Sequence, residues 1–386
     1  MDRKSLESKF NDISSRMRKK PYILAEEYIP EEIFYRDEQI EDIIAKISGG
    51  HNIMLKGAVS TGKTTVTKWL FKILKESETK YLFIYQNCRA TTIIQIITEI
   101  ANALEISLQR NKPIAHHIKK IKAELVERGF ERIYLCLDEI DFLLFKYNDK
   151  ELLYLFANEF TFRLILISNT TDWQKTIGIR TLNRLQSEII DFPAYEEKEL
   201  RGILEQRIKL AFENNIIFDK EIDTIIDILK KTDNTIRDAF SLLNSIYDYK
   251  IIKGYEDIMI PQIQIESLLE EVENQSMMQR LEKYDSNIRF AMYCICNYYN
   301  SNPSRKNFET TDIVKIWNKK SKSSSLKDIR SENSIRRYLS HLEAYNWIKK
   351  TTNSRGEGLT SWYNAYAPAF NPYDLWKEFE SYSMGK

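Results

Sequence analysis

The segment from Gly57 to Thr64 has the residue types and spacing of a loop that binds phosphate. It reads Gly57, Ala58, Val59, Ser60, Thr61, Gly62, Lys63 and Thr64, which fits the pattern G-x-x-x-x-G-K-[ST]. The glycines let backbone N–H groups turn toward phosphate oxygens, the lysine can reach the terminal phosphates, and the threonine hydroxyl can ligate Mg²⁺. Thr65 follows in the first turn of the predicted helix and is also a candidate nucleotide-binding residue. These residues predict binding of ATP or ADP together with Mg²⁺.

A pair of acidic residues, Asp138 and Glu139, directly follows the apolar run 133–137. An aspartate at the carboxyl end of a strand can hold the hydration shell of Mg²⁺, and the adjacent glutamate can polarise a water that attacks the terminal phosphate. Asn169 ends the next apolar run, where its amide could position that water; for an isolated asparagine there, a capping or turn role is the alternative. The chain is therefore predicted to hydrolyse ATP.

The elements that carry these residues indicate an α/β fold with a parallel sheet. Predicted strands cover residues 51–56, 81–87, 133–137 and 163–169. Predicted helices cover residues 36–48, 63–75, 92–104 and 114–128. Continuous apolar strands that alternate with helices are typical of a parallel sheet covered on both faces.

The strand signal disappears after residue 193, and the remaining chain divides into further domains. Residues 195–248 read as successive helices, which predicts a small helical lid. Another helix is expected over 263–281, and then three short helices precede two β-rich runs, the arrangement of a winged-helix fold. The predicted parts are a basic N-terminal arm, flexible or helical (1–20), an α/β nucleotide-binding domain (21–193), a lid (194–276) and a winged helix (277–386).

Net charge differs between these parts. The whole chain of 386 residues has 57 Lys and Arg against 56 Asp and Glu, which by itself argues against a uniformly basic nucleic-acid binder. Residues 277–386, however, contain 18 basic and 11 acidic residues, a balance of +7 that leaves −6 for the rest. This asymmetry is expected of a nucleotide-driven part joined to a basic nucleic-acid reader, although chance could also produce it.

The predicted helix over 333–345 has the pattern of a DNA-recognition helix. One face is apolar, and Arg336, Arg337 and Ser340 lie away from it, so the arginines could enter a major groove. Arg355 lies in the predicted wing next to a glycine that would let the backbone approach DNA. Four lysines that could contact phosphates precede the helix: Lys319, Lys320, Lys322 and Lys327. The alternative is a winged helix that contacts only protein.

Several other classes of protein are disfavoured. No apolar run approaches the roughly 18 residues of a membrane span, and the charged N-terminus is unlike a secretory signal, so we expect a cytoplasmic protein associated with the nucleoid. Free, buried thiols are expected in place of a metal site or disulfides for the four cysteines Cys88, Cys136, Cys294 and Cys296.

Five segments together resemble a known family, the AAA+ initiator ATPases of archaeal replication, which are related to the eukaryotic origin recognition complex and its helicase-loading partner. They are YIPEEIFYRDEQI (28–40), the P-loop, YQNCR (85–89), LDEIDFLL (137–144) and ISNTTDW (167–173). The resemblance extends over about residues 28–368. It implies a P-loop AAA+ domain, a helical lid and a C-terminal winged helix.

The resemblance also assigns roles to individual residues. Tyr28, Ile29 and Arg36 lie in the segment that wraps the adenine in this family. Asn169 corresponds to sensor 1, which reads the terminal phosphate and the water. Arg237 in the lid matches the sensor 2 arginine, which closes the lid over the phosphates.

Other residues match the family's motifs less closely. The arginine finger corresponds to Arg180 or, as a second choice, Arg184, because the family's usual Asp-Pro is absent before it. Ser60 replaces a usual glycine, and Asn234 replaces the glycine before sensor 2. Both departures predict a divergent member with slow turnover or tightly held nucleotide. An insert after the second strand touches DNA in the family, so the resemblance makes Arg89 and the helix from Thr92 secondary candidates for contact with DNA.

The resulting hypothesis is an origin-binding initiator, in which ATP acts as a conformational switch. Its expected partners are double-stranded origin DNA, the replicative helicase that it helps to load, and other initiator subunits. The alternative is a AAA+ winged-helix ATPase of a mobile element or a transcription regulator that has no helicase-loading role.

Overall fold

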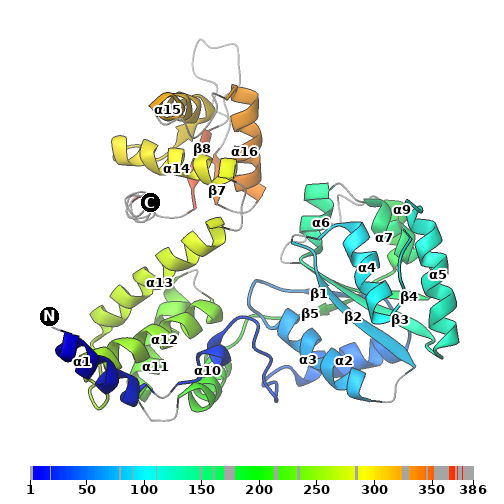
Figure 1. Cartoon of the computed structure of the whole chain (residues 1–386), viewed down its shortest axis with the longest axis horizontal. Helices are drawn as coiled ribbons and strands as arrows, with labels where there is room; N and C mark the ends of the chain where they lie inside the picture. The colour runs from blue at the N-terminus through cyan, green and yellow to red at the C-terminus, as the bar shows by residue number, and fades with distance from the viewer. Residues whose placement is uncertain are drawn as a thin grey trace. The chain divides into compact units, whose positions relative to one another are not determined.

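The chain divides into two compact units, Met1–Ile265 and Glu266–Lys386, each of which is described by itself. Figure 1 shows both in the computed structural model. The structure describes residues 3–17, 19–77, 80–89, 91–109, 111–147, 150–159, 161–168, 179–212, 216–232, 235–282, 286–323, 330–344, 347–351, 365–369, 372 and 376. Within these ranges, no helix is both long and apolar enough to cross a bilayer.

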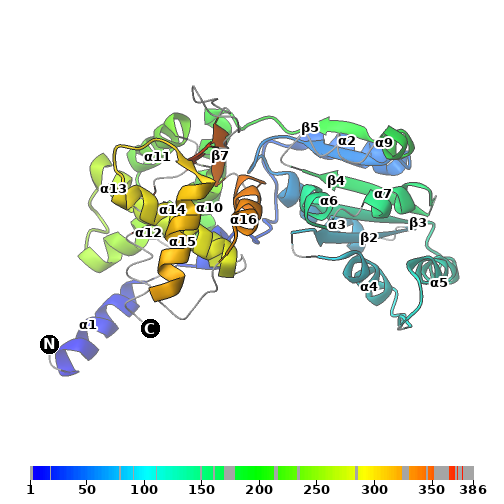
Figure 2. The ribbon, with the colours of Figure 1, turned by 90° about the horizontal axis from the view of Figure 1, so that it is seen from above.

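The first unit contains a five-stranded parallel sheet in the order β2-β3-β4-β1-β5, which Figure 2 shows from edge to edge. Its strands are β1 (Ile53–Lys56), β2 (Tyr81–Asn87), β3 (Arg132–Asp138), β4 (Phe162–Ile167) and β5 (Glu188–Asp191). The predicted parallel α/β fold and the four predicted strands are confirmed. Strand β5 was not predicted, because this short edge strand buries only Ile190 and so lacks a continuous apolar run.

Helices cover both faces of the sheet, as a parallel sheet requires. Along β3, Ile133, Leu135 and Leu137 pack into one core cluster, while Tyr134 and Cys136 pack into the other. The first cluster is completed by α4 (Ile93–Ala103), α5 (Ile114–Glu127), α6 (Ile140–Tyr147), α7 (Lys150–Ala157) and α9 (Ile179–Leu185). Helices α2 (Asp37–Ser48) and α3 (Lys63–Glu76) complete the second. All four cysteines are buried free thiols, as expected.

The helices predicted for the lid are α10 (Glu197–Ala211), α11 (Asp219–Lys231) and α12 (Ile236–Lys253). The N-terminal segment forms α1 (Arg3–Arg16) and the short 3₁₀ helix η1 (Pro21–Leu24), which pack against these helices. Arg16 pairs with Glu256 at 2.8 Å and Lys19 with Asp248 at 2.6 Å. Of the two conformations expected for the basic arm, the structure therefore has the helix.

Helix α13 (Gln262–Glu282), close to its predicted bounds, begins in the first unit and continues into the second. The other elements of the second unit are α14 (Ser286–Ser301), β6 (Phe308–Glu309), α15 (Thr310–Ser323), α16 (Glu332–Ala344), β7 (Ile348–Thr351) and β8 (Ala365–Pro368). The strands pair antiparallel in the order β6-β8-β7. Three helices with such a sheet match the arrangement expected of a winged helix. The predicted wing with Arg355 lies outside the described residues, and the four-part domain division stays a prediction.

Candidate nucleotide site and DNA-binding elements

The P-loop connects β1, inside the sheet, to the start of α3. A Cβ atom on Gly57 would overlap the carbonyl oxygen of Phe192, so only glycine fits there without displacing the backbone. Gly62 has φ 94°, a left-handed conformation that glycine adopts without strain, and it caps the N-terminus of α3. The loop is therefore held against the segment after β5 while its far end presents a helix N-terminus, which favours bound anions.

Lys63 is only 4% exposed. Its Nζ donates hydrogen bonds to the carbonyl oxygens of Gly57, at 2.9 Å, and Ala58, at 2.6 Å. Burial lowers the pKa of Lys63 to about 8; Asp138 opposes this shift and Arg237 adds to it. Burial outweighs the nearby Asp138 carboxylate in this shift, and a bound phosphate would add negative charge that favours the protonated amine.

Ser60 has φ 63°, which a residue with a Cβ rarely adopts. Its Oγ is buried and has no hydrogen-bond partner within the described part of the chain. The glycine that the family usually has at this position would be free of this strain. Ser60 therefore combines backbone strain with an unsatisfied hydroxyl in the loop that is predicted to hold phosphate.

The structure brings Thr64 and Asp138 together, as the predicted Mg²⁺ site requires. The Thr64 hydroxyl donates to Asp138 Oδ2 at 2.6 Å, and the Tyr85 hydroxyl donates to the same oxygen at 2.7 Å. Burial, followed by the charge of Asp138, raises the pKa of Tyr85, so Tyr85 remains a neutral donor. A carboxylate beside a hydroxyl is an oxygen-ligand set that suits Mg²⁺. These residues fit the predicted cofactor, and Tyr85 is a member of the site that sequence reasoning did not identify.

Glu139 is the other acidic residue at the end of β3. Its φ of 53° is left-handed, and burial raises the pKa of its carboxyl group. Its Oε2 is buried without a hydrogen bond among the described residues, and Arg89 Nε lies 3.9 Å away. A raised pKa moves the group toward the range in which it can accept a proton at neutral pH. Arg89 therefore lies beside Glu139 at the nucleotide site. The contact of Arg89 with DNA stays a prediction.

The structure describes three of the four remaining residues predicted for the nucleotide site. Arg237 lies in the first turn of α12 and pairs with Glu26, and its charge adds to the lowering of the pKa of Lys63 by burial. Arg180 and Arg184 are exposed on α9. Asn169 lies outside the described residues.

The predicted adenine segment lies against the lid. Tyr28 and Ile29 are half-buried, and the guanidinium of Arg207 on α10 lies 4.6 Å from the centre of the Tyr28 ring. The guanidinium of Arg36 contacts main-chain carbonyl groups of the P-loop and of Pro193. It thus belongs to the protein framework beside the site, a role that its sequence neighbourhood did not reveal.

Helix α16 has the two faces that its sequence predicts. Ile335, Leu339 and Leu342 are fully buried, whereas Arg336, Arg337 and Ser340 are exposed. Arg336 forms an ion pair with Glu332 at 2.7 Å, and the Ser340 hydroxyl donates to the Arg336 carbonyl oxygen at 3.0 Å. A DNA phosphate or base would have to compete with Glu332 for Arg336. Lys322 lies in α15, but its side chain is outside the described part.

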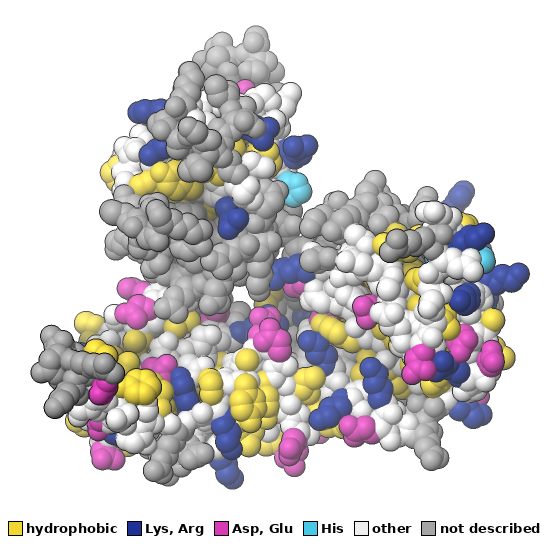
Figure 3. All heavy atoms as spheres, in the orientation of Figure 1, with side chains coloured by type: hydrophobic (Ala, Val, Ile, Leu, Met, Phe, Trp, Pro, Cys, Tyr) yellow, Lys and Arg dark blue, Asp and Glu magenta, His cyan; other side chains and the backbone are white. Residues whose placement is uncertain are grey.

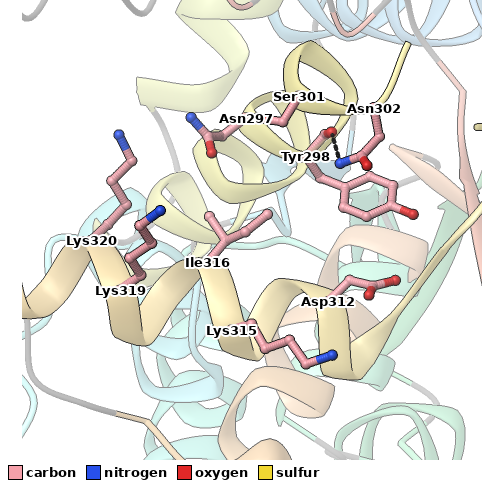
Figure 4. Close-up of a pocket in the computed structure, with 9 residues that line it drawn as sticks. All are labelled: Asn297, Tyr298, Ser301, Asn302, Asp312, Lys315, Ile316, Lys319 and Lys320. Carbon is pink, nitrogen blue, oxygen red and sulfur yellow. Dashed lines mark hydrogen bonds between the residues drawn. The ribbon is translucent and has the colours of Figure 1, made fainter. Parts of the chain in front are cut away.

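A pocket of roughly 490 Å³ lies between α14 and α15 (Figure 4). Lys315, Lys319 and Lys320 line it from α15, and Asn297 and Ser301 line it from α14. The described face of this unit in Figure 3 shows several Lys and Arg side chains, in agreement with the charge asymmetry of the sequence. Lys315 is a further basic residue that the sequence reasoning did not select.

Comparisons with known proteins agree with this geometry. A family model described as an AAA domain matches residues 46–177. The chain is 25% identical over 315 residues to an ORC1-type DNA replication protein 1 of Archaeoglobus fulgidus, covering 77% of this chain and 75% of the relative. It is 30% identical over 236 residues to the protein of the same name from Sulfolobus acidocaldarius, covering 57% and 59%.

Solved structures show the same fold along almost the whole chain. The Aeropyrum pernix ORC1 protein in complex with DNA has a TM-score of 0.76 at 18% identity and covers 94% of this chain and 96% of that one. The A. pernix ORC2 protein in ADPNP-ADP complexes has a TM-score of 0.58 at 17% identity, with coverage of 94% and 98%. With the P-loop, the acidic strand end and the lid in the order observed here, the chain contains an AAA domain and is similar, over most of its length, to archaeal ORC1-type DNA replication proteins.

Proposed function

We propose that this protein is an ATP-binding replication initiator that recognises origin duplex DNA and uses ATP binding and hydrolysis as a switch. The observation that carries the nucleotide half is the convergence of Lys63, Thr64 and Asp138 at the carboxyl ends of the parallel strands β1 and β3. Their positions match what a Mg²⁺-nucleotide needs: a cation for the phosphates, and a hydroxyl and carboxylate for the metal.

Each residue of the site has a separate role in the proposed hydrolysis of ATP. Thr64 and Asp138 would hold Mg²⁺, partly through water, and the ion would supply positive charge that neutralises the phosphates. Lys63 binds the terminal phosphates while the backbone of residues 57–62 surrounds them. Glu139, with its raised pKa, accepts the proton of the attacking water. Asn169 would orient that water, by the family resemblance.

Charge from the lid and from a second subunit would complete the switch. Arg237 extends from α12 and pairs with Glu26. A terminal phosphate would offer it a stronger partner and so favour a different lid position when ATP is bound. Arg180 or Arg184, exposed on α9, would act as the arginine finger toward a neighbouring initiator subunit.

DNA binding is assigned to the second unit. Arg336, Arg337 and Ser340 of α16 would face the major groove, and Arg355 of the wing and Lys322 would contact the backbone. A structural relative bound to DNA supports this half of the proposal. Loading of the replicative helicase would follow from origin binding. A AAA+ winged-helix ATPase of a mobile element or a transcription regulator would share the same site but lack the helicase partner.

The nucleotide assignment is tested by two substitutions in the full chain. Lys63→Ala should abolish ATP binding, whereas Glu139→Gln should retain binding and lose turnover. Binding is measured with a fluorescent ATP analogue and turnover by phosphate release. Unchanged ATP affinity in Lys63→Ala would rule out the P-loop assignment, and full turnover in Glu139→Gln would remove Glu139 from the proton transfer.

The DNA assignment is tested with duplex DNA from the protein's own genome, by footprinting and by titrations over a range of salt. Arg336→Ala/Arg337→Ala should weaken binding by at least roughly tenfold, since each good base contact contributes about 1–3 kcal/mol. The control Lys198→Ala/Lys220→Ala removes the same charge from exposed positions of the lid. If no wild-type footprint appears on any sequence, or if both double variants bind alike, the origin-reader proposal fails.

A further inference from the structure

Arg36 is a buried residue that contacts both the P-loop and the segment between β5 and the lid. It precedes α2 and is only 2% exposed. Its Nε donates to the carbonyl oxygen of Thr61 at 3.1 Å, and one terminal nitrogen donates to the carbonyl oxygen of Pro193 at 2.9 Å. Its guanidinium lies 3.7 Å from the centre of the Tyr195 ring. The P-loop is thereby tied to the segment that leads from β5 into the lid.

The chemistry of the guanidinium explains why an arginine suits this place. Its planar fork can donate to two carbonyl groups while its face stacks on an aromatic ring, which a lysine ammonium cannot do. The Tyr195 hydroxyl also lies 2.5 Å from where a Cβ on Gly62 would be. The last residues of the P-loop are therefore packed directly against Arg36 and Tyr195.

The preceding residue, Tyr35, makes the matching contact with the lid. Its φ is 60°, an uncommon conformation for an aromatic residue. Its hydroxyl fills the space that a Cβ would occupy on Gly202, in the interior of α10. A glycine inside a helix is unfavourable by about 1 kcal/mol relative to alanine. The room that Gly202 leaves for the Tyr35 ring gives a physical reason for this glycine.

We propose that Tyr35 and Arg36 couple the lid to the P-loop: Tyr35 follows the position of α10, and Arg36 holds the Thr61 carbonyl group. Both are positioning residues, because their contacts are to protein atoms. A displacement of α10 moves Tyr35, shifts the adjacent Arg36 and loosens the backbone that surrounds the phosphates. The consequence for ATP rests on the proposed function, whereas the mechanical link does not.

Amide hydrogen exchange of the nucleotide-free full chain tests this link without requiring ATP. In Arg36→Lys we expect exchange at the amides of residues 58–62 to accelerate at least roughly tenfold, as for loss of a hydrogen bond from a charged group. Gly202→Ala adds a Cβ that displaces Tyr35 and should accelerate the same amides, although α10 itself gains helix propensity. Acceleration confined to the P-loop distinguishes coupling from general destabilisation, which would raise exchange throughout the sheet.

Two controls match these substitutions. Arg163→Lys changes another arginine that donates to main-chain carbonyl groups, those of Gly50 and Phe162. Gly50 precedes β1, whereas the P-loop follows it, so this control lies at the other end of the strand. Lys198→Ala changes an exposed residue of α10. Neither control should alter P-loop exchange. If Arg36→Lys does not fold, Gly202→Ala alone decides the outcome.

A double variant tests whether the signal passes through the Tyr35 ring. Gly202→Ala should have no further effect on P-loop exchange in a Tyr35→Ala background, because the added Cβ then meets no ring. With ATP, Arg36→Lys should weaken affinity about tenfold, as for loss of a hydrogen bond from a charged group. The coupling proposal is overturned if P-loop exchange is unchanged in Arg36→Lys and Gly202→Ala, or rises equally in the controls. Lack of ATP binding by the wild type would instead overturn the proposed function.

Discussion

The buried ion pair between Glu221 and Lys250 allows a quantitative test of what holds the lid together. The two side chains are 1% and 0% exposed. Lys250 Nζ lies 2.7 Å from Glu221 Oε1 and donates to the Ile216 carbonyl oxygen at 2.7 Å. Glu221 also accepts the N–H groups of Phe218 and Ile260, both at 2.9 Å. This pair thus ties α11 and α12 to the two chain segments beside them.

Removal of one partner leaves the other charge buried. Lys250→Met and Glu221→Gln should each lower the free energy of unfolding of the lid by about 3–5 kcal/mol, the usual cost of an uncompensated buried charge. The double variant contains no buried charge, and its glutamine can still accept a backbone N–H. It should therefore lose only about 1–2 kcal/mol, far less than the sum of the single losses.

Native-state hydrogen exchange of α11 and α12 in the full chain measures these free energies, since a chain of two units need not unfold in a single step. Lys230→Met is the control, because Lys230 pairs with Glu197 on the exposed surface of the same lid and should have little effect. A loss below about 1 kcal/mol for Lys250→Met, or additive losses in the double variant, would refute this account of the pair.

Three smaller changes test the nucleotide site. Gly57→Ala should weaken ATP binding more than tenfold in titrations, because its Cβ would meet the Phe192 carbonyl group and displace the loop; unchanged affinity would contradict this. Ser60→Gly should raise the free energy of unfolding of the first unit by up to about 1 kcal/mol through relief of the positive φ. Native-state hydrogen exchange of the sheet measures this free energy, and a decrease would disprove the effect. Tyr85→Phe should lower the free energy of unfolding of the first unit by about 1.5–3 kcal/mol, since Asp138 loses a hydrogen bond. An unchanged free energy would show that this hydrogen bond does not stabilise the site.

The local sequence predicted the main elements of the fold well. Long apolar strands and amphipathic helices are visible because burial on a sheet face or a helix stripe repeats along the chain. The start of α3 was predicted because the P-loop pattern includes the helix N-terminus. Strand β5 was missed because pairing with β1, more than its own composition, makes it a strand.

Candidate site residues could be predicted where residues that act together are adjacent in one sequence motif. Lys63 and Thr64 belong to such a motif, as do Asp138 and Glu139. Tyr85 was missed because a tyrosine inside an apolar strand carries no local sign that its hydroxyl will reach a carboxylate 53 positions further along the chain.

The sequence by itself determined which chemistry this protein can perform: a phosphate-binding loop, an acidic strand end and an amphipathic basic helix are local patterns of residue type. Tertiary structure alone decided how these parts meet. Only folding places Arg36 between Thr61 and Pro193, fits Tyr35 over Gly202, and buries Lys250 against Glu221. Such contacts join residues distant in the chain, and they depend on distances and burial that exist only after the helices and strands have packed.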